Sequence, residues 1–506
     1  MTAAAEYELI ASVADLRDRV TAHIDDTGAR LADLFGTACD AGLLITAQLA
    51  GPDGMTTLDA LLPAGQASYP SLTPLVSSAF WYEREIHDMF GVTPQGHPRL
   101  EPLVLPADGP DLPRPGSEGG PARVEPDARA LPRHAAGPGL FTIPHGPVRS
   151  GVTESIEYLV ETPGEDIPHL NMRVFYKHRG IEKRFESMRP ADGVLLAERA
   201  EGVASVAHAI AFCQAVELIA GAEVPWRAAL IRTLHAELER LACHLDVIVR
   251  LADGAGLAVA TARFGWHKER VLRLTGQLSG SRFGRGVLAL GGVTGAPRLD
   301  PPAILAAAGE LERRIDPDIG LLMGTASFLD RLRRTGPLTL ARAAEHGALG
   351  PVGRASGCVD DTRQSRPYAA YGSLGTAVSS RDEGDALARL EVRVDEIASS
   401  FRLIRQAADE LDEAGSGPLG ADGAASDSTG ADWTGADGRA TGWAEAPQGE
   451  VLYDVRIEAG RIIRCRSRSA SFHNLVLMHE VFAGDILTDF PFIEASFGLS
   501  VAGAAS

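Results

Sequence analysis

The segment FYKHRGIEK, residues 175–183, gathers side chains that can move protons. If the segment is helical, His178 and Glu182 lie one turn apart, with Arg179 and Lys183 beside them. A carboxylate near an imidazole and two cations can have its pKa tuned toward neutrality, which suits proton transfer. The same spacing also fits a structural ion-pair network, so the residues alone leave both interpretations open.

A second cluster of charged and aromatic residues is WYEREIHDMFG, residues 81–91. An apolar stripe predicts a helix there, and Gly91 is expected to end it. Charged residues four apart predict ion pairs on the exposed side of that helix. The two pairs are Glu83 with His87 and Arg84 with Asp88.

Metal chemistry has weak support in the sequence. The helix pattern RTLHAELERLACHLD, residues 232–246, carries three carboxylates and two histidines, but no second Glu-x-x-His element accompanies it. The five cysteines lie far apart, without a CxxC pair for zinc or an iron–sulfur cluster, which indicates a reduced, cytoplasmic protein. They are Cys39, Cys213, Cys243, Cys358 and Cys465.

Charge and hydropathy limit the classes of partner, nucleic acids and membranes among them, that this chain is expected to bind directly. The 506 residues carry a net charge of −19, which repels phosphate backbones and anionic lipid headgroups, so no nucleic-acid partner is expected. The N-terminus places acidic residues before any basic one, unlike an export signal. The longest uncharged stretch, 60–82, contains three prolines and is a poor membrane-spanning helix. We therefore expect membrane association only through partner subunits.

Two segments have compositions that cannot build a core. Residues 107–139 contain seven prolines and six glycines and are interpreted as a linker. In residues 415–442, 24 of 28 are Gly, Ala, Ser, Asp or Thr, which predicts a disordered, acidic surface insertion. The predicted domains are therefore 1–106 and 140–506, separated by the linker.

Periodicity predicts an α+β protein. The first domain is expected to be a small α/β sandwich, with a helix at 13–24 and a hairpin of strands 44–50 and 55–62. The second is expected to be mainly helical with flanking strands at 154–160 and 451–467. Its predicted helices are 195–220, 226–251, 261–278, 302–313, 319–332 and 385–411.

Longer stretches carry a family resemblance. Residues 69–106, YPSLTPLVSSAFWYEREIHDMFGVTPQGHPRLEPLVLP, resemble the C subunit of respiratory complex I. From residue 146 onward, GPVRSGVTESIEYLVETPGEDI, FYKHRGIEK, LGPVGRASGCVDDTR and DFPFIEASFGLS resemble the D subunit and the large subunit of membrane-bound [NiFe] hydrogenases. The two occur in one chain, as in the large subunit of formate hydrogenlyase.

The resemblance implies that the nickel ligands are missing. The family holds its nickel–iron centre with two pairs of thiolates, and soft thiolates suit such metals. The corresponding positions here are Glu201, Ala204, Ser500 and Gly503, and Gln448 replaces a family arginine. We therefore expect no nickel–iron site in this chain.

Other family residues are partly retained. In the D subunit, one loop carries a quinone-binding histidine; the matching residues here, 146–151, contain none, and residues 201–207 contain no tyrosine. The glutamate that the family uses as a proton conductor is retained as Glu182. The resemblance thus implies Glu182 as a catalytic candidate, and the charged segment around it adds His178 and Arg179.

The expected function is that of a peripheral subunit in a membrane-associated, complex I-like or hydrogenase-related oxidoreductase complex. It would lie in the cytoplasm on the inner face of the membrane and bind no cofactor itself. The implied partners are a small subunit bearing an iron–sulfur cluster and membrane subunits, with quinone or NAD(H) acting at the level of the complex. Two alternatives stay open: a non-redox scaffold that couples its partners, and an active hydrogenase with substitute ligands.

Overall fold

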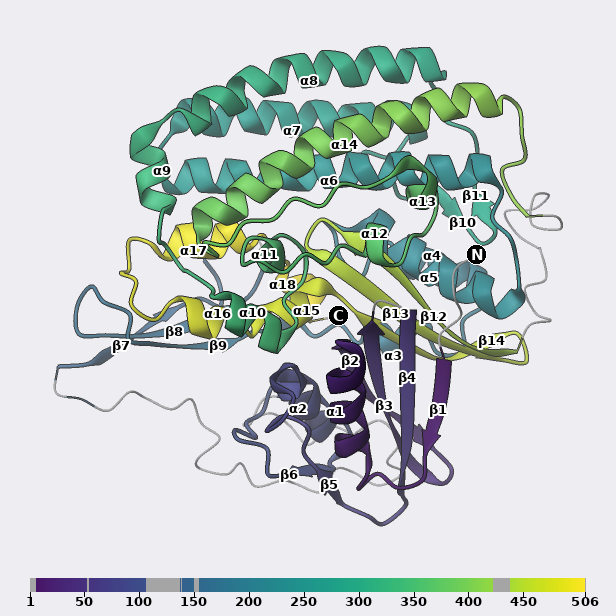
Figure 1. Ribbon diagram of the computed structural model, residues 1–506, viewed down its shortest axis with the longest axis vertical. Helices are drawn as coiled ribbons and strands as arrows, with labels where there is room; N and C mark the ends of the chain where they lie inside the picture. The colour runs from purple at the N-terminus through teal and green to yellow at the C-terminus, as the bar shows by residue number, and fades with distance from the viewer. Residues whose placement is uncertain are drawn as a thin grey trace.

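The computed structural model describes residues 6–51, 54–105, 137, 139–149, 154–421 and 437–505. Most of the predicted linker, and residues 422–436 of the predicted insertion, lie outside the described residues. A sheet-based N-terminal domain is followed by a larger, mainly helical domain (Figure 1). The predicted α+β class is confirmed.

The N-terminal domain is built on a four-stranded sheet in the order β1-β4-β3-β2. β1 runs parallel to β4, and the other neighbours are antiparallel. The predicted hairpin is confirmed, because β3 and β4 pair along their whole length. The elements are β1 (Glu6–Ile10), α1 (Leu16–Thr27), β2 (Arg30–Cys39), β3 (Gly42–Gly51), β4 (Gly54–Pro63), β5 (Ser68–Pro70), a 3-10 turn (Ser77–Ala79), α2 (Phe80–Phe90) and β6 (Thr93–Gln95).

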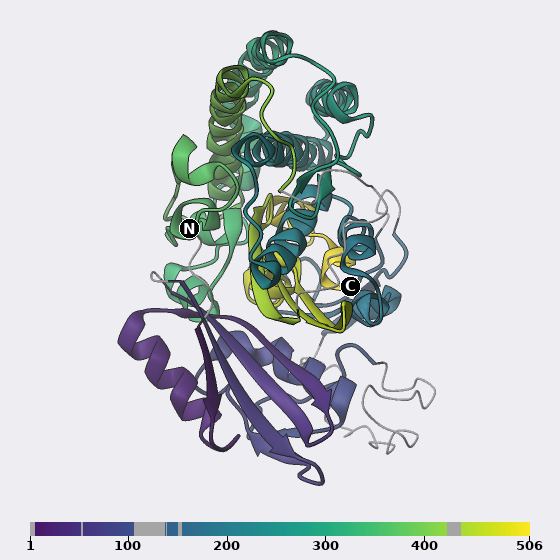
Figure 2. The same cartoon turned by 90° about the vertical axis from the view of Figure 1, so that its right-hand side faces the viewer.

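Helix α1 covers one face of this sheet, and α2 lies beside β2 (Figure 1). Leu16 and Val20 on α1 are fully buried in the same apolar cluster as Ile45 and Leu58 of the sheet. The sheet faces β12 (Gly438–Ala446), β13 (Gly449–Glu458) and β14 (Arg461–Arg468) of the second domain (Figure 2).

Four long helices form the layer of the second domain that lies furthest from the N-terminal domain (Figures 1 and 2). The helix expected over 226–251 carries a row of buried leucines, which fixes it in the core: Leu234, Leu238, Leu241 and Leu245. The four are α6 (Trp226–Gly254), α7 (Ala258–Ser279), α8 (Pro301–Met323) and α14 (Ala386–Ala414).

Between these helices and the N-terminal domain lies the antiparallel sheet β12-β13-β14, against which α5 (Ser205–Ala220) packs (Figure 1). A second antiparallel sheet contains β7 (Phe141–His145), β8 (Glu157–Thr162) and β9 (His169–Arg173). The remaining elements are a 3-10 turn (Phe175–Lys177), α3 (Ile181–Phe185), α4 (Pro190–Ala197), α5 (Ser205–Ala220), β10 (Leu288–Ala289), β11 (Gly292–Val293), α9 (Ala326–Leu332), α10 (Leu340–His346), α11 (Gly350–Arg354), α12 (Thr362–Ser365), α13 (Tyr371–Leu374), α15 (Ala470–Leu475), α16 (Met478–Val481), α17 (Phe490–Phe497) and α18 (Val501–Ala504).

Some element boundaries differ from the prediction. The expected helix 195–220 is interrupted between α4 and α5, where the Glu198 carboxylate accepts a hydrogen bond from the amide of Gly286 at 2.7 Å. Conversely, 302–313 and the start of 319–332 form one helix, α8, that contains Pro317. The helix continues past this proline because Ile315 and Leu322, on either side of it, are buried in one core.

The predicted insertion over 415–442 is wrong at its C-terminal end, because β12 begins at Gly438. Small residues there serve packing rather than disorder. A Cβ atom at Gly442 would lie 2.1 Å from the carbonyl oxygen of Ala211 on α5, so only glycine lets the strand approach the helix.

The two domains meet across buried polar contacts, which we call the interdomain seam. Gln48 on β3 donates to Asp454 on β13 at 3.0 Å, and Arg439 on β12 donates to Asp59 on β4 at 2.7 Å. Buried charges need partners, so each domain satisfies groups of the other. Further contacts in the interdomain seam are Arg30–Glu450, Arg466–Asp33 and Tyr82–His473.

Candidate functional site

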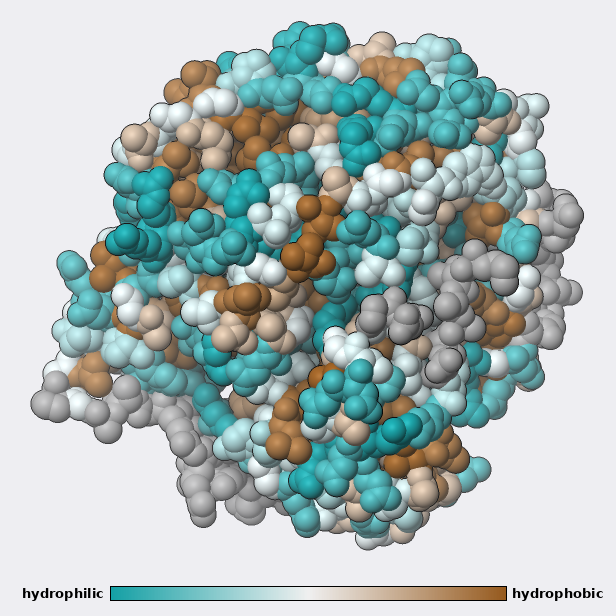
Figure 3. Space-filling model, in the orientation of Figure 1, coloured by the Kyte–Doolittle hydropathy of each residue, from teal (hydrophilic) through white to brown (hydrophobic). Residues whose placement is uncertain are grey.

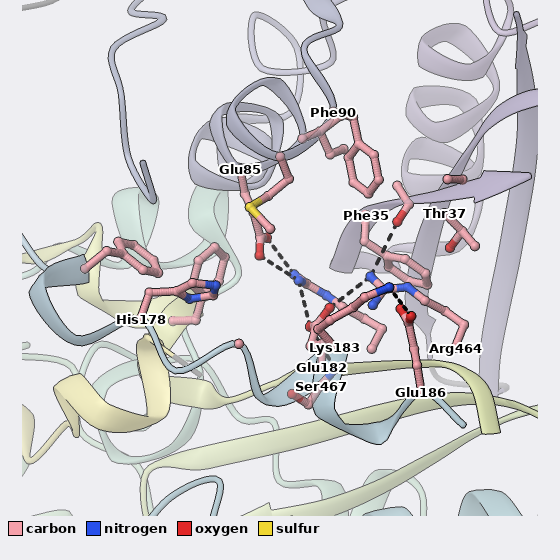
Figure 4. A pocket seen from close by; sticks show the side chains of 18 of the residues that line it. Phe35, Thr37, Glu85, Phe90, His178, Glu182, Lys183, Glu186, Arg464 and Ser467 are labelled. Atoms are coloured by element: carbon pink, nitrogen blue, oxygen red, sulfur yellow. Dashed lines mark hydrogen bonds and ion pairs between the residues drawn. The ribbon is translucent and has the colours of Figure 1, made fainter. Parts of the chain in front are cut away.

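A cavity of about 300 Å³ lies where the two domains meet. β2 and α2 form its N-terminal wall, while α3, β14 and the segment before α3 form the opposite wall (Figure 4). The rings of Phe35, Phe90 and Phe175 contribute apolar surface, and charged side chains project between them. The cavity therefore combines a partly apolar lining with titratable groups from both domains.

Glu182 and His178 both line this cavity, but they do not share a helix. Gly180 adopts a left-handed conformation, with φ of 60°, and α3 begins only at Ile181. The predicted one-turn spacing of His178 and Glu182 is therefore wrong, because Gly180 breaks the helical path between them. In Figure 4 the His178 ring lies apart from Glu182.

Glu182 belongs to a group of charges centred on Arg466, which we call the Arg466 cluster: Arg466, Arg464, Asp33, Glu85 and Glu182. Figure 4 labels Glu85, Glu182 and Arg464 among these residues. The Arg466 guanidinium donates to Asp33 at 3.0 Å, to Glu85 at 2.9 Å and to Glu182 at 3.1 Å. Arg464 contacts the second oxygen of Glu182 at 2.9 Å. One guanidinium thus joins carboxylates from β2, α2 and α3.

Glu182 and Glu85 have pKa values shifted in opposite directions. Burial alone would raise the pKa of Glu182, but Arg466, Arg464 and the amide of Ser467 together hold it below the usual range. The pKa of Glu85 is raised, because burial and the nearby charges of Glu182 and Asp33 outweigh its contact with Arg466. Glu182 is therefore an anion at neutral pH, which overturns the expectation that its pKa lies near neutrality.

The other two candidate residues, His178 and Arg179, lie in different surroundings. Protein atoms around the His178 ring displace water and lower its pKa, despite the opposing effect of Glu182, so the ring is neutral at pH 7. Arg179 instead donates to the carbonyl oxygens of Arg199 at 3.0 Å, Ala200 and Ala502 at 2.5 Å. It joins two loops and does not line the cavity.

The two loops joined by Arg179 carry the positions that correspond to the nickel ligands. The carboxylate of Glu201 is buried and lies 3.3 Å from Nε2 of His208, whose Nδ1 lies 2.9 Å from the Tyr453 hydroxyl. A Cβ atom at Gly503 would lie only 2.3 Å from Oε2 of Glu201. The Glu201 side chain thus fills the space in front of Gly503.

Ser500, Ala204 and Gln448, the other positions compared with the family's metal site, also pack against neighbouring protein groups. Ser500 donates its hydroxyl to Glu154 at 2.6 Å, and the buried Ala204 precedes α5. Gln448 donates to the sulfur of Cys243 at 3.3 Å. The described residues contain no group of three or more His, Cys, Asp or Glu side chains placed to hold a metal ion.

The ion pairs expected on the exposed side of α2 are wrong. Glu83 is fully buried and accepts hydrogen bonds from Ser71 and from the amide of Leu72. Arg84 donates to the carbonyl oxygen of Glu101, and Asp88 accepts from three backbone amides of residues 103–105. These charges stabilise loops rather than one another. Gly91 does end the helix, as predicted.

A second, larger set of charges lies inside the helical domain, and we call it the bundle network. Arg354 contacts Glu396 at 2.7 Å and Glu445 at 3.0 Å, and the His244 ring lies 2.8 Å from Glu396. All of these side chains are buried. The charged members are Glu237, Glu396, Glu445 and Asp361 with Arg240, Arg354, Arg363 and Arg393. The helix pattern 232–246 thus contributes to an ion network.

Sequence reasoning missed four members of the Arg466 cluster. Glu85 lies in the charged segment 81–91, but the spacing rule paired only its neighbours. Asp33 is an acidic residue within the mostly apolar strand β2. A charge inside such a strand was the signal that could have indicated a buried ion pair. Arg464 and Arg466 alternate with apolar residues on β14, which indicates only a strand.

The face shown in Figure 3 is mostly hydrophilic over α8 and α14, with hydrophobic residues in separate patches. Each helix in the described part of the chain is too short or too polar to cross a bilayer.

Comparison with known proteins places the two domains in one family. Residues 33–124 match the 30 Kd subunit of respiratory-chain NADH dehydrogenase, and residues 258–504 match its 49 Kd subunit. Formate hydrogenlyase subunit 5 of Escherichia coli is 30% identical over 86% of this chain and 76% of that protein. The C/D subunit of NADH-quinone oxidoreductase from Acidiphilium cryptum is 29% identical over 71% of this chain and 64% of that protein.

A solved structure agrees with these relatives. A chain of the membrane-bound sulfane sulfur reductase, an archaeal respiratory membrane complex, superposes with a TM-score of 0.67 at 26% identity, covering 73% of this chain and 99% of that chain. The two family models include α2 and β14, which line the cavity. This chain therefore belongs to the family of fused 30 Kd/49 Kd subunits that includes formate hydrogenlyase subunit 5 and the C/D subunits of NADH-quinone oxidoreductase.

Proposed function

We propose that this chain is the fused C/D-type subunit of a membrane-associated oxidoreductase complex, bound at the cytoplasmic face through partner subunits. The observation that carries the proposal is the presence of both family domains in one chain, packed across a polar interdomain seam. Its partners are a small subunit bearing an iron–sulfur cluster and membrane subunits. Quinone or NAD(H) acts at the level of the complex, and this chain holds no redox group of its own.

A nickel–iron group does not fit the residues present. Glu201, Ala204, Ser500 and Gly503 offer no thiolate, and the Glu201 carboxylate fills the space in front of Gly503. No step of the proposed function runs through such a group. Elemental analysis of the purified chain is expected to find neither stoichiometric nickel nor cluster iron, and one nickel per chain would contradict the proposal.

Within the complex, Glu182, His178 and Arg179 are the functional residues. Glu182 supplies a fixed negative charge in the cavity that holds both arginines of the Arg466 cluster, and so supports proton transfer or coupling there. His178 lines the same cavity as a neutral imidazole. Arg179 keeps the two loops behind it in place.

The test uses the complex purified from membranes of the native host. Partner subunits are identified by mass spectrometry, and turnover is compared between Glu182→Gln and Glu186→Gln. Glu186 lines the same cavity but pairs with the exposed Lys183, so it is the matched control. We expect normal assembly and loss of most turnover for Glu182→Gln alone. Normal turnover per assembled complex would reject the role of Glu182, and a chain without membrane partners would reject the function.

A second candidate is a subunit that couples its partners by conformation without taking part in electron transfer. The close packing of the loops around Glu201 and Gly503 favours it, because no space is left there for a redox group. Reduction of the cluster-bearing partner in the absence and presence of this chain distinguishes the two. An unchanged electron-transfer rate, with loss of ion translocation when the chain is absent, supports the coupling role.

A further inference from the structure

The Arg466 cluster has an excess of negative charge. It contains three carboxylates, Asp33, Glu85 and Glu182, and two guanidiniums, Arg464 and Arg466. Other charges do not restore the balance. Lys183, which also lines the cavity, is engaged by Glu186, and His178 is neutral. Charges that are removed from water without a partner are costly, so the cluster favours uptake of one positive charge.

The hydrogen bonds identify the carboxylate that is least stabilised as an anion. Asp33 accepts from Arg466 and also from the amide of Leu34 at 2.9 Å. Glu182 accepts from both arginines and from the amide of Ser467 at 3.1 Å. For Glu85, the hydrogen-bond donor in the described residues is Arg466, with which both of its oxygens form a contact of 2.9 Å.

Glu85 is also placed to exchange protons with solvent. Its side chain projects from α2 into the cavity and is 20% exposed, whereas Asp33 is only 1% exposed (Figure 4). The groups that face it from the packed elements are Arg466 on β14, Glu182 on α3 and Asp33 on β2.

We propose that Glu85 is the proton-binding group of the interdomain cavity, and that Glu182 stays ionised as its electrostatic partner. The step is a simple protonation: a proton from solvent in the cavity adds to one carboxylate oxygen of Glu85, and no other bond is made or broken. Arg466 then keeps Asp33 and Glu182 as its two anions, and the four groups that stay charged, two guanidiniums and two carboxylates, balance. The raised pKa of Glu85 agrees with this order of protonation.

Protonation at Glu85 has a structural consequence. The neutral carboxyl loses the charge-assisted part of its two contacts with Arg466, so α2 is held less tightly against β14. Proton uptake is thereby linked to the contact between the two domains. This inference rests on the proposed function for its place in turnover, but the protonation itself is a property of the chain alone.

The experiment is a carboxyl titration of the full-length chain labelled with ¹³C at the Glu side-chain carboxyl carbon, followed by infrared difference spectroscopy. Spectra of wild type are compared with Glu85→Gln, Glu182→Gln and the control Glu186→Gln. Other glutamates also have a raised pKa, Glu239 among them at about 8, so the assignment rests on which band is lost. We expect one of the bands that titrate above the usual glutamate range to disappear in Glu85→Gln, and all of them to persist in the control. In Glu182→Gln this band is expected to shift to lower pH, because a nearby negative charge is removed.

If Glu85→Gln leaves every band of the wild-type titration in place, or if the band lost in Glu85→Gln is also lost in Glu182→Gln, the inference is overturned. If Glu85→Gln does not fold, Glu85→Asp keeps the carboxyl but moves it from Arg466, and a shifted band of unchanged intensity supports the assignment while an unmoved band rejects it. Turnover of the complex is a separate readout. A confirmed band with turnover unaffected by Glu85→Gln and Glu182→Gln would reject the proposed function of the cavity and leave the proton site standing.

Discussion

The Arg466 cluster and the bundle network are made of the same residue types but differ in charge balance and access to solvent. The bundle network contains four carboxylates and four guanidiniums, all buried in the helical domain; three of the guanidiniums form ion pairs with the carboxylates, and Arg393 contacts His244. The Arg466 cluster has three carboxylates for two guanidiniums and borders a cavity between domains. A balanced and enclosed network holds a fold together, whereas an unbalanced and accessible one can bind a proton.

The largest effect is expected from breaking the bundle network. Arg354→Met leaves Glu396 and Glu445 buried without their shared cation, and removal of one partner from a buried ion pair costs about 3–5 kcal/mol. Urea unfolding monitored by circular dichroism measures the change in free energy. A loss below about 1 kcal/mol would show that the network is not the structural element that its burial indicates.

A smaller loss of stability is expected from a change where the loop that carries Glu201 meets the loop that carries Gly503. Gly503→Ala brings a Cβ atom against the Glu201 carboxylate, and overpacking costs about 1–3 kcal/mol. Glu201→Ala in the same chain removes the clash, so the two changes are expected to be non-additive. Thermal unfolding of the single and double variants tests this, and strictly additive losses would contradict the close contact.

The pH dependence of stability is expected to differ in sign between Glu396 of the bundle network and Glu85 of the Arg466 cluster. The pKa of Glu396 is lowered, so its stabilisation is present above the unfolded pKa of about 4.3 and is lost as pH falls toward the folded value. The pKa of Glu85 is raised, so its protonated form stabilises the native state, and this stability is lost as pH rises through the folded pKa.

Stability measured from pH 3 to pH 9 separates these contributions. Glu396→Gln is expected to flatten the acidic limb of the curve, and Glu85→Gln the limb above the unfolded glutamate pKa. If both variants flatten the same limb of the curve of stability against pH, the predicted contrast between Glu396 and Glu85 is wrong.

The smallest effect is expected at the edge of the Arg466 cluster. Arg464→Met removes one cation from Glu182, which keeps Arg466 and the amide of Ser467. Because both side chains are partly solvated, the expected loss is below about 1 kcal/mol. The same denaturation assay applies, and a loss equal to that of Arg354→Met would remove the distinction between an open and an enclosed network.

The sequence predicted the elements better than the partners of charged side chains. Periodicity located α6, α7 and α14 to within a few residues because their apolar faces are buried. Local spacing failed for Glu83 and Asp88, since a helix pattern does not show that a charge can be buried by binding loop amides. The partners in the Arg466 cluster were beyond local rules, because Asp33 and Arg466 are 433 residues apart.

The polar interdomain seam also affects how the chain emerges during synthesis. Gln48 has no partner until the ribosome has synthesised Thr441, 393 residues later. At a translation rate of about 5–20 residues per second, this delay is roughly 20–80 s. An apolar sheet face exposed for that time would invite aggregation. Because the waiting face carries Asp33, Gln48 and Asp59, water solvates it until β12 and β13 arrive. The polar face of the interdomain seam therefore limits aggregation of the N-terminal domain until the second domain has been synthesised.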